Sequence, residues 1–167
     1  MYSNYLWATS RGKWVKKPHH GKGEKCVFCG IAGNDPSIPK KVLYKDKDIM
    51  VVMNLFPYNK GHLQVVPIRH VVFPEDLTDE EYAKFFLMIR KAMALIRKTL
   101  EPKGFNVGLN VGGDIAGGSI MHLHAQIVPR YTRDLGFMEV TIGTKVMTES
   151  IETTYKKFMV NIAMLKG

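Results

Sequence analysis

The sequence predicts an α+β domain with a largely antiparallel sheet. Strand-like segments follow one another closely over residues 41–67 and again over 105–128, and two helical segments fall between or after them. Of the 167 residues, 46% are hydrophobic and 23% are charged, as expected for one globular domain with a core.

Three strand-like segments open the predicted sheet. Residues 41–45 and 49–53 flank a turn at residues 46–48. Residues 62–67 form the third segment, after a loop over residues 54–61 that is rich in turn-forming residues.

The clearest helix of the chain follows these strands. Thr78 and Glu81 have the spacing of a capping box, and apolar residues recur three or four positions apart over residues 82–100, before Pro102 ends the pattern. We interpret this apolar stripe as core.

Two more strands and a second helix complete the predicted fold. Residues 105–111 and 122–128 alternate as strands do, and the loop between them contains four glycines over residues 112–119. A last helix is expected from about residue 148 to 165.

The segment His122-Leu-His124-Ala-Gln126-Ile-Val carries the chemistry. Because alternate side chains of a strand share a face, His122, His124 and Gln126 should point one way and the apolar residues between them into the core. The alternative is a sheet edge with two ordinary histidines. The adjacent glycine-rich loop favours a functional site, since its free N–H groups can bind phosphate.

His124 is the candidate nucleophile of this row. A neutral imidazole can attack phosphorus at neutral pH and carry a nucleotidyl group as a reactive P–N bond. Gln126 offers an amide donor but neither an acid nor a base. Ser119 and the backbone near Gly117 and Gly118 are candidates for binding the phosphate oxygens.

Cys26 and Cys29 form a C-x-x-C pair that is ambiguous by itself. It is compatible with a redox pair, half of a zinc site or coincidence. A zinc site would need two further nitrogen or sulfur ligands, and the composition does not choose among the six histidines.

These motifs resemble the histidine triad (HIT) superfamily, whose signature is His-x-His-x-His with apolar residues between. Gln126 takes the place of the third histidine, as in the transferase branches, the galactose-1-phosphate uridylyltransferases and diadenosine tetraphosphate phosphorylases. The resemblance covers residues 26 to about 160, including C-x-x-C, residues 54–62 and 66–70. It implies the HIT-like fold, with one long and one C-terminal helix.

The resemblance also implies roles for particular residues. His124 would be the nucleophile, Gln126 would bind the α-phosphate, and Asn54 would contact the ribose. The remaining phosphate contacts would be Asn110, Gly117, Gly118 and Ser119. The ligands of a structural zinc ion would be Cys26, Cys29, His70 and His122. A homodimer is expected on the same basis.

The predicted function is nucleotidyl transfer, and its most concrete form is phosphorolysis of diadenosine tetraphosphate to ATP and ADP. Arg130 or Lys145 is a candidate for holding the inorganic phosphate, whereas His62 is interpreted as an ordinary loop histidine with its hydrogen bonds satisfied. One alternative is a hydrolase of dinucleoside polyphosphates or nucleoside phosphoramidates. The other is a non-catalytic module that binds nucleotides or nucleic acid.

The net charge of +9 is concentrated near the N-terminus. Residues 1–25 carry six basic residues against one acidic residue, so we expect a basic extension followed by a single domain over residues 26–167. The anionic partner is then a nucleoside polyphosphate, and nucleic acid is not expected as a partner. With two cysteines, no secretory signal pattern and no membrane-length apolar run, the cytoplasm is the expected compartment.

Overall fold

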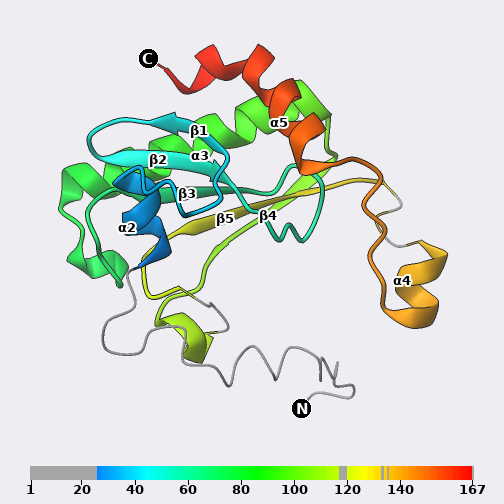
Figure 1. Ribbon diagram of the computed structural model, residues 1–167, viewed down its shortest axis with the longest axis horizontal. Coiled ribbons are helices and arrows are strands. Elements are labelled where there is room, and N and C mark those ends of the chain that lie inside the picture. Colours follow the sequence, from blue (N-terminus) through cyan, green and yellow to red (C-terminus); the bar gives the residue numbers. More distant parts are fainter. Residues whose placement is uncertain (1–25, 117–119, 133, 135, 167) are drawn as a thin grey trace.

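A computed structural model describes residues 26–116, 120–132, 134 and 136–166. Its five strands form one sheet in the order β1-β2-β3-β5-β4, and every neighbouring pair is antiparallel (Figure 1). The strands are β1 (Val42–Lys45), β2 (Ile49–Met53), β3 (Leu63–Pro67), β4 (Gly104–Leu109) and β5 (Ala125–Arg130). The predicted fold class is confirmed. Because β5 lies inside the sheet, the sheet-edge alternative for its residues is wrong.

The long helix α3 (Asp79–Leu100) begins at the predicted capping box. The Thr78 hydroxyl accepts from the backbone N–H of Glu81 at 3.2 Å, and the Glu81 carboxylate accepts from the backbone N–H of Thr78 at 2.9 Å. Glu101 ends the helix in the left-handed conformation, with φ of 50°. The predicted last helix is present as α5 (Ile151–Val160), followed by a separate 3-10 turn, η3 (Ile162–Leu165).

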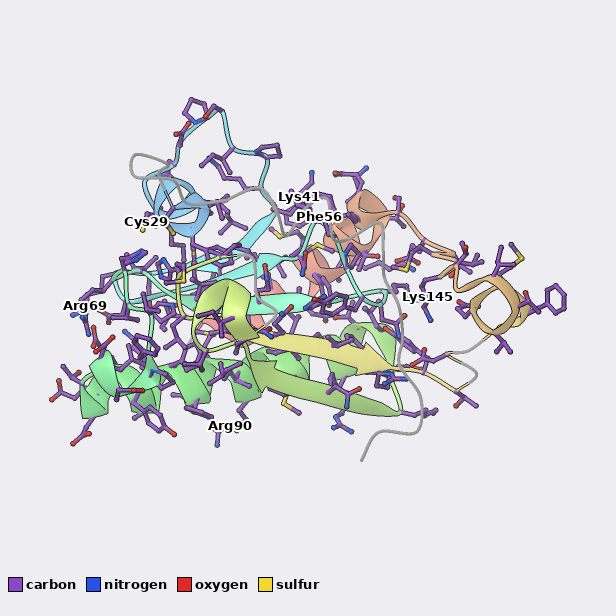
Figure 2. The ribbon with its side chains drawn as sticks, turned by 90° about the horizontal axis from the view of Figure 1, so that it is seen from below. Cys29, Lys41, Phe56, Arg69, Arg90 and Lys145 are labelled. Atoms are coloured by element: carbon purple, nitrogen blue, oxygen red, sulfur yellow. The ribbon has the colours of Figure 1, made fainter. Side chains whose placement is uncertain are left out.

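The two faces of the sheet have different partners. Alternate strand residues such as Val51, Val65 and Ile127 pack with α3 and α5 in the main core. On the other face Val52 and Val66 pack against the short helix α2 (Val27–Ala32) in a smaller cluster. Figure 2 shows the sheet between α2 and α3. On this same face of the sheet, β3 and β5 also carry polar side chains.

Strand β5 begins later than predicted. The expected strand over residues 122–128 is instead the ladder Ala125–Arg130, and His122 and His124 precede it. The reason is that the Leu123 N–H bonds to the Val71 carbonyl, at 2.7 Å, outside the sheet ladder. The histidines therefore lie in an irregular segment that β5 anchors.

Two helices were not predicted from the sequence. One is α2, over the C-x-x-C pair, and the other is α4 (Phe137–Ile142), which stands away from the sheet in Figure 1. Both have six residues, too few for a helical period to show. Within the described residues, none of the helices has the length and apolar character needed to cross a bilayer.

Gly61 positions the residue that follows it. Its φ is +81°, a conformation that favours glycine, and a Cβ there would collide with the side chain of Leu100. The glycine lets the loop after β2 pack onto the end of α3 and turn directly into His62 and β3.

Candidate active site

The sheet places Gln126 on the face opposite α3. The register sets Gln64 on one side of Gln126 and Gly108 on the other. Ala125 and Ile127 are fully buried on the α3 side, so strand alternation turns Gln126 the other way. Among the residues that the structure describes, nothing outside the chain neighbours lies within 4 Å of a Cβ built on Gly108. The described part of the sheet therefore has space next to Gln126.

His124 is held in one tautomer. Its Nδ1 donates to the backbone carbonyl of His122 at 2.8 Å, and because a carbonyl only accepts, the lone pair is on Nε2. The ring is 3% exposed and lies 5.1 Å from the ring of Phe28. Burial lowers the pKa of His124 below its ordinary value, which keeps the ring neutral at pH 7. This is the form of imidazole that a nucleophile requires.

Two predicted substrate-binding residues are hydrogen-bonded to each other. Gln126 Nε2 donates to Asn110 Oδ1 at 2.7 Å, and Asn110 Nδ2 donates to the carbonyl of Ala116 at 2.8 Å. The pair is thereby connected to the glycine-rich segment at Ala116, directly before Gly117. The other predicted phosphate contacts lie outside the described residues; they are Gly117, Gly118 and Ser119.

The interpretation of His62 as a satisfied loop histidine is wrong. The side chain is fully buried, and its Nδ1 accepts from the backbone N–H of Tyr58 at 3.2 Å. Its Nε2 has no hydrogen-bond partner within the described residues, and the same is true of Gln126 Oε1. The sequence signal that could have drawn attention to His62 is a histidine directly before an apolar strand. Its proximity to the candidate row of His124 and Gln126 depends on the pairing of β3 with β5, which the local sequence pattern does not give.

Asn54 lies next to His62. Its Oδ1 accepts from the backbone N–H of Phe56 at 2.8 Å, and its Nδ2 lies 3.4 Å from His62 Nδ1. The side chain therefore shapes the loop after β2 and brings that loop to the same region as His124. Its predicted contact with a ribose stays a prediction.

Three separate segments meet in a cluster of thiols and imidazoles. The possible ligand atoms of Cys26, Cys29, His70 and His122 all lie within 4.8 Å of one another. Cys26 Sγ lies 3.3 Å from His122 Nδ1, and Cys29 Sγ lies 3.2 Å from His70 Nδ1. These separations are close to the ~3.5 Å edges of a tetrahedral zinc site with two sulfur and two nitrogen ligands. The donor set and its spacing fit zinc.

His122 is oriented toward this cluster by its other nitrogen. Nε2 donates to the carbonyl of Pro67 at 3.0 Å, which leaves the Nδ1 lone pair facing the thiols. Burial lowers the pKa of His122 to about 4, so the ring is neutral, as metal ligation needs. Burial and the neighbouring Cys26 raise the pKa of Cys29 to about 11. A bound cation would oppose that shift and favour the thiolate.

The two candidate cations for inorganic phosphate already have partners. Arg130 pairs with Asp134 at 2.7 Å and donates to Asn106, and Lys145 donates to the Asp134 backbone carbonyl. Both therefore help to fix the segment that follows β5.

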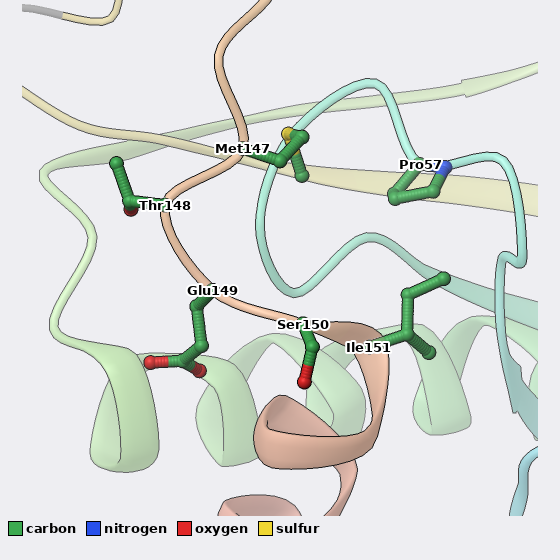
Figure 3. A pocket seen from close by; sticks show the side chains of 6 residues that line it. All are labelled: Pro57, Met147, Thr148, Glu149, Ser150 and Ile151. Carbon is green, nitrogen blue, oxygen red and sulfur yellow. The ribbon is translucent and has the colours of Figure 1, made fainter.

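A cavity of about 390 Å³ lies between the loop after β2 and the start of α5 (Figure 3). It is lined by Pro57 and residues 147–151. None of these residues belongs to the predicted site, and Glu149 within it bonds to Thr154 and pairs with Lys157. The chemistry described above lies on the sheet face and not in this cavity.

Comparisons with known proteins bear on the family of the chain. A family model described as HIT domain matches residues 35–133. A protein named AP-4-A phosphorylase from Mycobacterium tuberculosis (strain ATCC 25618 / H37Rv) is 42% identical over 113 residues, which are 68% of this chain and 58% of that protein. The chain thus matches little more than half of that relative's length.

Two further matches are a relative from a yeast and a solved structure. Bis(5'-nucleosyl)-tetraphosphatase [asymmetrical] from Schizosaccharomyces pombe is 34% identical over 97 residues, 58% of this chain and 53% of that protein. The crystal structure of a Zn-bound histidine triad family protein from Mycobacterium smegmatis matches with a TM-score of 0.69 and 26% identity. It covers 84% of this chain and 95% of that one.

Proposed function

The chain belongs to the HIT domain family, and from this premise we propose that it transfers nucleotidyl groups through a nucleotidyl-histidine intermediate on His124. One observation carries the proposal. The Nδ1 of His124 donates to the His122 carbonyl, so the neutral ring has its lone pair on Nε2, which is the atom available for attack. The relatives named for reactions of dinucleoside polyphosphates support this class of substrate.

The proposed reaction has two displacements at one phosphorus atom. Nε2 of His124 attacks the α-phosphorus, the P–N bond forms, and the P–O bond to the leaving polyphosphate breaks with its electron pair. The acceptor then attacks the same phosphorus and the P–N bond breaks, which returns the lone pair to Nε2. Gln126 donates to an α-phosphate oxygen as charge develops. The further proposed substrate contacts are Asn54, Asn110, Gly117, Gly118 and Ser119.

Phosphate is the acceptor that fits Gln126. An amide cannot remove a proton, whereas water must lose one when it attacks phosphorus. Inorganic phosphate is already an anion at neutral pH and needs no base. We therefore propose phosphorolysis of diadenosine tetraphosphate to ATP and ADP, and the 42% identical relative named as a phosphorylase supports this choice. Hydrolysis is the competing reaction.

Product analysis separates the two reactions. We expect the protein to convert diadenosine tetraphosphate to equal amounts of ATP and ADP in phosphate buffer and to be nearly inactive without phosphate. Chromatographic quantification of ATP, ADP and AMP measures this. Formation of AMP at an equal rate without phosphate would establish the hydrolase, and no turnover in either buffer would favour a non-catalytic binding module.

We propose that Cys26, Cys29, His70 and His122 hold a zinc ion. The cluster geometry and the Zn-bound structural relative support it. With four protein ligands zinc would be structural, binding α2 and the segment after β3 to the residues that precede β5. Both cysteines are free thiols, which suits a reducing compartment and supports the cytoplasm as the proposed location.

We also propose a homodimer through β4 and α3. β4 is an edge strand with Val107 45% exposed, and Phe86 is an exposed aromatic residue of α3. The first turn of α3 is acidic and its last turn is basic, so two copies packed antiparallel would pair unlike charges. Homodimers with this symmetry present the same patch from each copy.

The dimer proposal predicts a change of mass on substitution. We expect Phe86→Glu to convert the dimer to a monomer, because it places a charge at the centre of the apolar contact. Light scattering after size exclusion measures the mass. Val160→Glu, which changes an exposed apolar residue of α5 instead, should leave the dimer intact. A monomeric wild type would contradict the proposal.

A further inference from the structure

The two cysteines of the chain lie side by side at the start of α2. Cys26 is the N-cap residue and Cys29 is the third residue of the helix, which is the spacing at which Thr78 and Glu81 bond to each other at the start of α3. The two Sγ atoms belong to the group of ligand atoms that lie within 4.8 Å of one another. Both are free thiols and both are partly exposed.

This placement permits a disulfide without unwinding the helix. Residues three apart at a helix start have Cα atoms about 5 Å apart, which lies inside the range of about 4.4–6.8 Å that a disulfide needs. The body of α2 is anchored separately, since Phe28 and Ile31 are buried in the smaller hydrophobic cluster. The thiols can therefore be joined while α2 stays on the sheet.

The thiols are connected to the candidate nucleophile by two routes. The Sγ atoms of Cys26 and Cys29 lie 3.3 and 3.7 Å from His122 Nδ1, and the His122 carbonyl accepts from His124 Nδ1 at 2.8 Å. Between the two cysteines in sequence, Phe28 contacts both imidazoles, with ring centroids 5.7 Å from His122 and 5.1 Å from His124. A chemical change at the thiols therefore reaches the ring of His124.

We propose that Cys26 and Cys29 form a redox switch, in which a peroxide joins them in a disulfide and thereby slows the proposed nucleotidyl transfer. This inference rests on that proposed function. One thiolate attacks a peroxide oxygen, so that an S–O bond forms, the O–O bond breaks and hydroxide leaves. The second thiolate attacks the sulfenic sulfur, the S–S bond forms and the second hydroxide leaves. The thiols lose two electrons in total, and the peroxide is reduced to water.

The disulfide removes what holds His122 on the thiol side. Disulfide sulfurs are not thiolate ligands, so the proposed zinc ion would be released. The ring of His122 would then keep only the bond from Nε2 to the Pro67 carbonyl. The backbone carbonyl that fixes the tautomer of His124 would be held less firmly, and we expect kcat to fall by about tenfold. Transient disulfides of this kind occur in reducing compartments.

Oxidation of the zinc-loaded wild type tests the switch. After treatment with hydrogen peroxide, intact mass should show the loss of two hydrogens, and peptide mapping should link Cys26 to Cys29. About one zinc ion per chain should be released to a chromogenic chelator, in parallel with the fall in kcat. Dithiothreitol with added zinc should restore the thiols, the metal and kcat together.

The double variant Cys26→Ser, Cys29→Ser is the matched control. It has no thiols, so any response of its activity to peroxide reports other oxidation, chiefly of the ten methionines. We expect peroxide to leave the kcat of this variant at its starting value. An equal fractional loss in the variant would overturn the proposal. So would oxidation of the wild-type thiols to sulfinic acids without a disulfide, or a disulfide form with unchanged kcat.

A readout at His124 makes the test independent of turnover. The exchange of the Nδ1 hydrogen of His124, followed by nitrogen NMR of labelled histidine, should be faster in the disulfide form because its acceptor carbonyl is held less firmly. Unchanged exchange in that form would overturn the coupling. If the disulfide forms and exchange accelerates, but neither form processes diadenosine tetraphosphate, the proposed function fails while the redox coupling to His124 stands.

Discussion

His124→Gly should lower the rate of nucleotidyl transfer by about 10⁴-fold or more, the range seen when a covalent nucleophile is removed. The neighbouring groups cannot replace it. Gln126 is an amide, and the Nδ1 of His122 faces the thiol cluster. The substitution removes a buried ring that contacts Phe28, so thermal unfolding should be measured alongside the rate. We expect the variant to stay folded and to bind the substrate.

Trapping the intermediate provides the second measurement for this prediction. After mixing with α-phosphate-labelled diadenosine tetraphosphate and rapid denaturation, the wild type should carry label in an acid-labile P–N bond. His124→Gly should carry none. Gln126→Ala is the informative comparison, because it keeps the nucleophile and should form the same adduct more slowly. Label on the glycine variant would transfer the nucleophilic role to another residue.

Local patterns predicted most of the secondary structure. The capping box at Thr78 and the apolar period over residues 82–100 defined α3 because both signals repeat within a few residues. The continuous apolar run over residues 49–53 likewise predicted β2 with its observed bounds. Where the backbone bonds outside the sheet, the pattern failed: residues 122–124 alternate in sequence, but the Leu123 N–H bonds to the Val71 carbonyl instead of continuing the ladder.

The residues of the candidate site could not be brought together from local sequence patterns alone. The two thiols and two imidazoles of the cluster come from positions up to 96 residues apart, such as Cys26 and His122. Spacing alone left the histidine ligands open, and only family resemblance chose between them. The burial of His62 near this site was missed for the same reason, since it depends on the pairing of β3 with β5. The burial of an imidazole whose Nε2 has no partner among the described residues can be recognised only in three dimensions.

Removing both thiols should release the metal and destabilise the fold. We expect the double variant Cys26→Ser, Cys29→Ser to purify with almost no zinc, whereas the wild type holds about one ion per chain. The free energy of unfolding should fall by about 3 kcal/mol or more, because metal binding is coupled to folding. Elemental analysis and denaturant unfolding measure the two effects. Arg69→Ala, next to a proposed ligand but paired with Glu81 on the surface, should keep its zinc.

The same double variant should also lose activity, although zinc touches no reacting atom in the proposed mechanism. His122 supplies both a proposed ligand nitrogen and the carbonyl that fixes the tautomer of His124. Without the ion, the ring of His122 loses its anchor on α2 and the carbonyl is held less firmly. We expect kcat to fall by about tenfold, the cost of roughly 1.4 kcal/mol of lost positioning, with a parallel loss when a chelator strips the wild type. Full activity in a zinc-free protein would show that Pro67 and the β5 ladder hold His122 without help from the thiols.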